Sequence, residues 1–175
     1  MNKFYWVAAP VVLGSLLAAF STLGLADAPE EDAVERGKYL ATIMDCGGCH
    51  TDGYLVGQPD PKRYMAGSNI GFGSPDGVVY PPNLTPHTEH GLGRWTDEQI
   101  ILAIRSGQRP DGRILAPIMP WPHYSNLTDA DAEALVAYLR SLEPNEFRPP
   151  APVAAGSPVS FPYLELRVPD AGSGD

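Results

Sequence analysis

The helix-forming part of this sequence is short and interrupted, and this limits the core that the chain can build. Apolar residues recur at helical spacing in three segments, residues 32–45, 96–107 and 128–143. Between them, residues 51–94 and 108–126 are rich in Gly, Pro, Asn and Asp and show no sustained period. Three short helices leave too little apolar material for an ordinary core, so we expect another group to fill the centre.

Capping signals mark the ends of these predicted helices. Asp32 is a candidate N-cap of the first helix, and Thr96 with Gln99 forms a capping-box pattern at the start of the second. Thr128 starts the last helix and Pro144 stops it. The sequence therefore predicts an all-α domain of short helices and long loops.

Composition excludes several function classes. The 175 residues include 18 Gly and 19 Pro, roughly a fifth of the chain, where average usage is about 12%. The net charge is −9 and no basic stripe is present, so we expect no nucleic-acid partner. Two cysteines are too few for a disulfide framework or a four-cysteine zinc site.

The amino terminus has the character of an export or anchoring segment. The 22 residues 4–25 carry no charge after Lys3 and reach the length of about 20 residues that a bilayer-spanning helix needs. Residues 26–28, Ala-Asp-Ala, offer a cleavage site and support a removed signal segment as the alternative. We expect residues 1–28 to form an N-terminal transmembrane helix, and both alternatives place the remaining chain on the periplasmic side of a bacterial inner membrane.

The rest of the chain divides into two parts. Residues 29–144 contain the three predicted helices and form the expected domain. Residues 145–175 are rich in proline and have no period, so we expect an extended C-terminal arm.

One motif carries chemistry, the sequence Cys46-Gly-Gly-Cys49-His50. This C-x-x-C-H pattern is the attachment signature of a c-type haem, in which two thiols add to the haem vinyl groups and the adjacent His binds the iron. The alternative is a thioredoxin-type redox pair, which requires a preceding strand, whereas here a helix is predicted to precede the motif. We therefore predict one covalently attached haem c with His50 as an iron ligand.

The sixth ligand of the iron decides between electron transfer and ligand chemistry. The candidates beyond the motif are Met44, Met65, Met119, His87, His90 and His123. We favour Met119, because the prolines at 117, 120 and 122 stiffen the loop around its side chain. Met44 lies on a helix face, where a Met usually fills core space. A His/Met pair closes the iron to external ligands, and His123 is the first alternative to test.

Residues 32–143 resemble the class I cytochrome c family. Residues 37–40, Gly-Lys-Tyr-Leu, look like the first helix of the family, and Tyr138 with Leu139 looks like part of its last. In the family these helices cross, which implies Gly37 against Tyr138. The resemblance implies a class I cytochrome c fold, with three or more short helices and long loops around one haem c.

The same resemblance implies further haem contacts. Residues 81–84, Pro-Pro-Asn-Leu, are similar to the G-P-N-L of the family except at the first position. By resemblance, the Pro82 carbonyl accepts a hydrogen bond from His50 Nδ1, and Leu84 packs on the haem. Trp95 matches the family Trp that donates to a haem propionate.

A narrower resemblance concerns residues 80–86, 91–98 and 107–122, which follow the pattern of cytochrome subunits of bacterial membrane-bound dehydrogenases. Those subunits commonly carry three haems, and this chain has one motif, so it is similar to a single module. The long spacing from His50 to the Pro-Asn-Leu segment implies an insertion near 53–79 that covers part of the haem.

Two further patterns stay open. Asn83-Leu-Thr and Asn126-Leu-Thr each fit the pattern of a glycosylation acceptor. The alternatives are that Asn83 makes a hydrogen bond in the haem loop and that Asn126 is a residue near a helix cap. Arg105, Arg109 and Arg113 either lie near the haem propionates or a partner, or form a solvated edge.

These observations predict a membrane-anchored, single-haem electron carrier and not an enzyme, since no open iron position or acid–base pair is visible. It transfers electrons between a membrane-associated dehydrogenase or respiratory complex and a downstream acceptor. The alternatives are a haem-bearing accessory subunit of a larger assembly, or a gas-binding haem protein if Met119 is not a ligand. The predicted cofactor-binding residues are Cys46, Cys49, His50, Pro82, Leu84, Trp95 and Met119.

Overall fold

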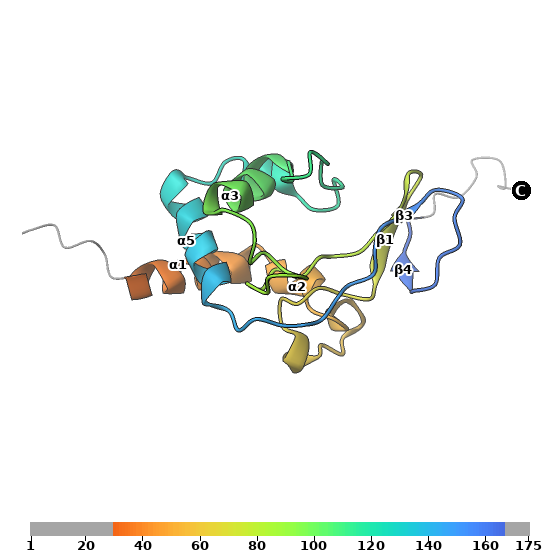
Figure 1. Cartoon of the computed structure of the whole chain (residues 1–175), viewed down its shortest axis with the longest axis horizontal. Helices are drawn as coiled ribbons and strands as arrows, with labels where there is room; N and C mark the ends of the chain where they lie inside the picture. The colour runs from red at the N-terminus through yellow and green to blue at the C-terminus, as the bar shows by residue number, and fades with distance from the viewer. Residues whose placement is uncertain (1–29, 167–175) are drawn as a thin grey trace, which may run out of the picture.

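The computed structural model describes residues 30–166, and the three predicted helices are present in it (Figure 1). They are α1 (Glu30–Ile43), α3 (Asp97–Ser106) and α5 (Asp129–Ser141). Shorter helical segments lie between them: α2 (Cys46–His50), the 3₁₀ turns η1 (Tyr54–Val56) and η2 (Pro61–Arg63), and α4 (Trp121–Tyr124).

Helix α1 packs across α5, and the main core forms around this crossing. A Cβ at Gly37 would collide with the carbonyl oxygen of Ala134 and would lie 2.7 Å from the Cβ of Tyr138. Only glycine therefore permits this approach, and Gly37 does lie against Tyr138. The buried cluster contains Leu40, Ala41, Met65, Leu92, Ile100, Leu135, Val136, Tyr138 and Leu139.

The caps that the sequence predicts for α3 and α5 are formed. The side chain of Thr96 accepts from the backbone N–H of Gln99, and the Gln99 side chain accepts from the backbone N–H of Thr96. The Thr128 side chain accepts from the backbone N–H of Asp131. Arg140 of α5 donates to backbone carbonyls in the loop before α3, which ties the two helices together.

A four-stranded sheet corrects the prediction of an all-α fold. Strands β1 (Gly71–Ser74) and β2 (Gly77–Val79) form an antiparallel hairpin. Strand β3 (Val153–Ala154) pairs with β2 antiparallel, and β4 (Tyr163–Leu164) pairs with β1 parallel, giving the order β3-β2-β1-β4. These strands have two to four residues each, too short for an alternating pattern, and their pairing joins segments distant in sequence.

The predicted C-terminal arm is extended, but it is bound to the rest of the molecule. We call residues 145–152 the strap, because they run from the end of α5 past α2 to the sheet (Figure 1). The side-chain nitrogen of Asn83 donates to the carbonyl oxygens of Asn145 at 2.8 Å and Phe147 at 3.0 Å. The backbone N–H of Asn145 donates to Oγ1 of Thr85 at 3.0 Å. Strands β1 and β2 of the insertion pair with β4 and β3 of the C-terminal arm, so these two segments, which no sequence pattern connects, form one sheet.

The predicted transmembrane helix at residues 1–28 lies outside the described residues. Among residues 30–166, no helix is both long enough and apolar enough to cross a bilayer.

Candidate haem site

A cavity of about 980 Å³ is lined by α2, the loop before α4, the strap and the sheet. This volume lies at the upper end of the range of roughly 300–1,000 Å³ that small-molecule sites occupy. All seven residues predicted to bind the cofactor line it: Cys46, Cys49, His50, Pro82, Leu84, Trp95 and Met119. Apolar side chains of α3 and α5, such as Ile100 and Leu135, close its inner wall. The cavity therefore suits a large, mostly apolar cofactor.

Helix α2 carries both thiols to the cavity. Asp45 precedes the helix with φ 54, and its carboxylate occupies the space where a Cβ of Gly48 would lie. Burial raises the pKa of Cys46 to about 11 and also raises the pKa of Cys49, with a further contribution from the negative charge of Asp45. Redox-active C-x-x-C thiols have a lowered pKa, so this environment argues against the thioredoxin-type alternative.

His50 is buried, and its orientation is set by one hydrogen bond. Its Nδ1 lies 2.8 Å from the carbonyl oxygen of Pro82. Because a carbonyl can only accept, Nδ1 must carry the proton, which leaves Nε2 available to a metal. Burial lowers the pKa of His50, and the hydrogen bond to Pro82 partly opposes this effect. The imidazole is therefore held in the neutral form that coordinates metals.

The segment that carries Pro82 is itself fixed. The backbone N–H of Leu84 donates to the carbonyl oxygen of Met65 at 2.8 Å. The side-chain oxygen of Asn83 accepts from both the backbone N–H and the hydroxyl of Thr85. Met65 is fully buried with φ 57, so it supports this segment from the core.

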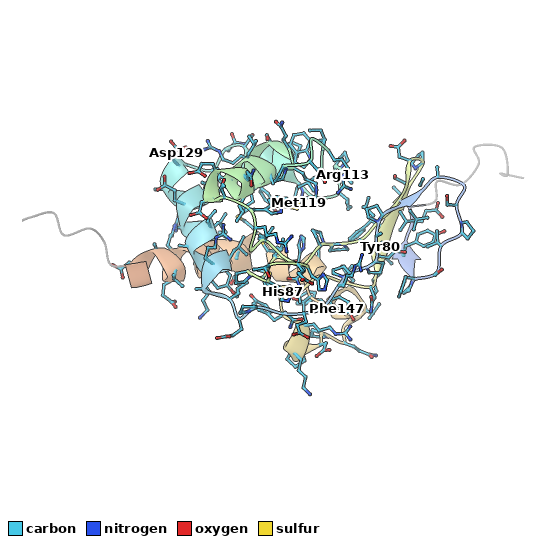
Figure 2. All side chains as sticks on the ribbon, viewed as in Figure 1. Tyr80, His87, Arg113, Met119, Asp129 and Phe147 are labelled. Atoms are coloured by element: carbon cyan, nitrogen blue, oxygen red, sulfur yellow. The ribbon has the colours of Figure 1, made fainter. Side chains whose placement is uncertain are left out.

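Met119 reaches the same cavity from the loop between α3 and α4 (Figure 2). The indole N–H of Trp121 donates to the carbonyl oxygen of Leu115 at 3.1 Å. The backbone N–H of Met119 donates to the carbonyl oxygen of Ala116 at 3.0 Å. The Trp121 ring also fills the space beside Gly107, where a Cβ would lie 2.8 Å from it. These contacts hold the loop, and the half-buried Met119 side chain faces the site from an element other than α2.

The other candidate ligands are less well placed. Three lie off the cavity: Met65, His87 and His123. His123 is exposed, and His87 accepts from the backbone N–H of His90 at its Nδ1. Met44 and His90 line the cavity, but Met44 packs against the core and the His90 ring stacks on His87 with centroids 5.1 Å apart.

Two of the three arginines considered from the sequence lie at the cavity. Arg109 places its guanidinium over the Trp95 ring, 5.1 Å from the centroid. Arg109 and Arg113 both bond the carboxylate of Asp111, at 3.5 and 2.7 Å. Hydrogen bonding from Arg113 lowers the pKa of Asp111 to about 2. Arg105 pairs with a carboxylate of α5 and does not line the cavity.

Sequence reasoning missed part of the cavity wall. Phe72, Val79 and Tyr80 line it from the hairpin and the residue after it, and residues 148–152 line it from the strap. The insertion was expected to cover part of the haem. The proline-rich strap sequence predicts stiffness but carries no signal of the surface on which it lies.

A C-x-x-C-H helix that faces a Met across an apolar cavity is the arrangement of the c-type haem proteins. Sequence comparison agrees, since the family model for cytochrome c matches residues 34–143. The chain therefore belongs to the cytochrome c family, and its cofactor is haem c. The resemblance identified from the motifs is confirmed.

Several relatives are cytochrome subunits of dehydrogenases. The chain is 36% identical over 158 residues to the cytochrome c subunit of the quinone alcohol dehydrogenase of Gluconobacter oxydans, covering 90% of this chain and 30% of that protein. It is 37% identical over 131 residues to the fructose dehydrogenase cytochrome subunit of Gluconobacter japonicus, covering 75% and 25%. It is 37% identical over 128 residues to the gluconate 2-dehydrogenase cytochrome c subunit of Pantoea cypripedii, covering 73% and 27%. The chain spans less than a third of the length of these curated relatives.

Proposed function

We propose that this chain is a single-haem cytochrome c that carries electrons from a dehydrogenase to a downstream acceptor in the bacterial periplasm. One observation carries the proposal: a single cavity brings Cys46, Cys49 and His50 of α2 together with Met119 of a separate loop. The dehydrogenase cytochrome subunits among the relatives support this class of partner. Its role is electron transfer and not catalysis.

Each residue at the site has a distinct task in this proposal. When bound, haem c supplies an iron centre that accepts and releases one electron. Cys46 and Cys49 would hold the cofactor through thioether bonds. His50 would ligate the iron through the lone pair of Nε2, because the Pro82 carbonyl keeps the proton on Nδ1. Met119 would be the second protein ligand of the iron, through its thioether sulfur.

The surrounding side chains tune the potential of the iron. Leu84 and the apolar lining from α3 and α5 exclude water, which disfavours the additional charge of the oxidised centre. Trp95 and Arg109 both line the cavity, with the guanidinium of Arg109 over the Trp95 ring, and would offer a hydrogen-bond donor and a cation to anionic groups of the cofactor.

The experiment that tests the proposal replaces Met119. Met119→Ala should leave the covalent haem in place and open the ferrous iron to carbon monoxide, whereas the unaltered protein should bind this ligand poorly. Met119→His should keep the iron closed and lower the midpoint potential, because a thioether stabilises ferrous iron more than a nitrogen donor does.

Met44→Leu is the matched control, because Met44 also lines the cavity but packs against the core. It should change neither carbon monoxide binding nor the potential. If the unaltered ferrous protein already binds carbon monoxide readily, or Met119→Ala leaves the spectrum unchanged, Met119 is not a ligand. The gas-binding alternative then replaces electron transfer.

A further inference from the structure

We propose that Arg148, on the strap, binds a propionate carboxylate of the haem and raises the potential of the iron. This inference rests on the proposed function, because it requires bound haem c. It assigns a cofactor contact to the segment after the last helix.

The attachment chemistry determines which wall of the cavity receives the propionates. The vinyl groups that react with thiols and the two propionates lie on opposite halves of the porphyrin. The propionates must therefore point away from Cys46 and Cys49. Asp45, one of the two acidic side chains on the lining, is next to Cys46 and thus lies on the thiol side. The other, Glu89, is exposed.

Three arginines line the cavity: Arg109, Arg113 and Arg148. The first two share the carboxylate of Asp111, so their charge is already partly compensated. Arg148 has no hydrogen bond or ion pair within residues 30–166, the part of the chain that the structure describes. The Arg148 side chain is exposed at the rim of the cavity, and a guanidinium there without a carboxylate partner is suited to a bidentate bond with a carboxylate.

The backbone on both sides of Arg148 is held in place. Asn83 donates to the carbonyl oxygens of Asn145 and Phe147, which come shortly before it. The guanidinium of Arg63 lies over the Phe147 ring, 4.2 Å from its centroid, and Figure 2 labels Phe147 below Met119. Pro149 and a second proline follow Arg148 and restrict its backbone. The backbone at Arg148 is therefore held in place before a ligand arrives, although its side chain is exposed.

The strap and the axial histidine share one support. Asn83 and Thr85, which bind the strap, lie one and three residues after Pro82, whose carbonyl orients His50. A cation fixed by this segment lowers the energy of the reduced iron relative to the oxidised iron, because reduction removes one positive charge from the centre. Arg148 therefore acts on the potential as well as on the carboxylate.

The test uses the full-length holoprotein and the variants Arg148→Gln and Arg148→Lys. Resonance Raman spectroscopy reports the propionate bending bands, which respond to hydrogen bonding at the carboxylates, and redox titration gives the midpoint potential. Arg36→Gln is the matched control: it removes the same charge, but Arg36 lies on α1, pairs with Asp131 and is not on the cavity.

Arg148→Gln should shift a propionate bending band and lower the midpoint potential, with covalent haem retained. Arg148→Lys keeps the charge but loses the planar guanidinium that can form two hydrogen bonds with one carboxylate. Its potential should therefore be close to that of the unaltered protein, whereas its propionate band should lie between those of the unaltered protein and Arg148→Gln. Arg36→Gln should change neither quantity. The inference is wrong if Arg148→Gln leaves the bands in place, or if both Gln variants lower the potential equally. Absence of covalent haem in the unaltered protein would instead overturn the proposed function itself.

Discussion

Two identical tripeptides in different surroundings allow a sharp test of how the strap is held. Asn83-Leu-Thr and Asn126-Leu-Thr share their sequence, but Asn83 is 1% exposed whereas Asn126 is exposed. Asn83 makes four side-chain hydrogen bonds, two to strap carbonyls and two from Thr85. Asn126 donates one, to the carbonyl oxygen of His123.

Asn83→Ala should destabilise the holoprotein by about 3 kcal/mol. A hydrogen bond contributes about 1 kcal/mol net, and the loss of four is partly offset because the released strap carbonyls can bind water. For a chain of this size the loss corresponds to a fall in Tm of roughly 6–12 °C. Asn126→Ala should change stability by less than about 0.5 kcal/mol.

Thermal unfolding followed by circular dichroism measures the difference, and limited proteolysis locates it. Cleavage within residues 145–166 should accelerate in Asn83→Ala only, because Asn83 binds the strap. Equal melting temperatures in the two variants, or a strap that stays resistant to protease in Asn83→Ala, would refute the reasoning.

Two more predictions concern the helix crossing and the loop that carries Met119. Gly37→Ala should lower stability by about 1–2 kcal/mol in chemical unfolding, because overpacking against α5 outweighs the gain in helix propensity, and a neutral result would contradict the crossing. Lys38→Ala, at the exposed neighbouring position, is its control. Asp111 has an ordinary pKa of 3.8 that is lowered to about 2, so its contribution is complete above about pH 4 and is lost as the pH falls toward 2. Asp111→Asn should therefore flatten this part of the acid-unfolding profile, and an unchanged profile would show that the carboxylate does not stabilise the loop.

The helices could be predicted because their signals are local. The Thr96 and Thr128 caps act within a few residues, and the observed starts of α3 and α5 follow directly after them. Gly37 could be assigned to the crossing because the resemblance specified a small residue there. The C-x-x-C-H motif is likewise contiguous, so its chemistry could be read without the fold.

The sheet and the strap could not be predicted because they depend on long-range pairing. Gly71 and Gly77 sit in strands of four and three residues, too short for alternation to be recognised. The place of Arg148 on the cavity could not be predicted for the same reason, because Asn83, distant in the sequence, binds the backbone just before it. The prolines around Met119 favoured it as a ligand over Met65, but sequence alone did not show that Met65 is completely buried away from the cavity.

The central claim is that Cys46 and Cys49 hold one haem c in the cavity, and its most direct test is the fate of the haem after denaturation. The purified protein is unfolded, extracted with acid acetone, and the haem in each fraction is measured as its pyridine complex. The account predicts one haem per chain, all of it remaining with the polypeptide, and its loss from the Cys46→Ala/Cys49→Ala variant. Haem that passes into the acetone, or a chain purified from a cytochrome c-maturing host without haem, would contradict the account.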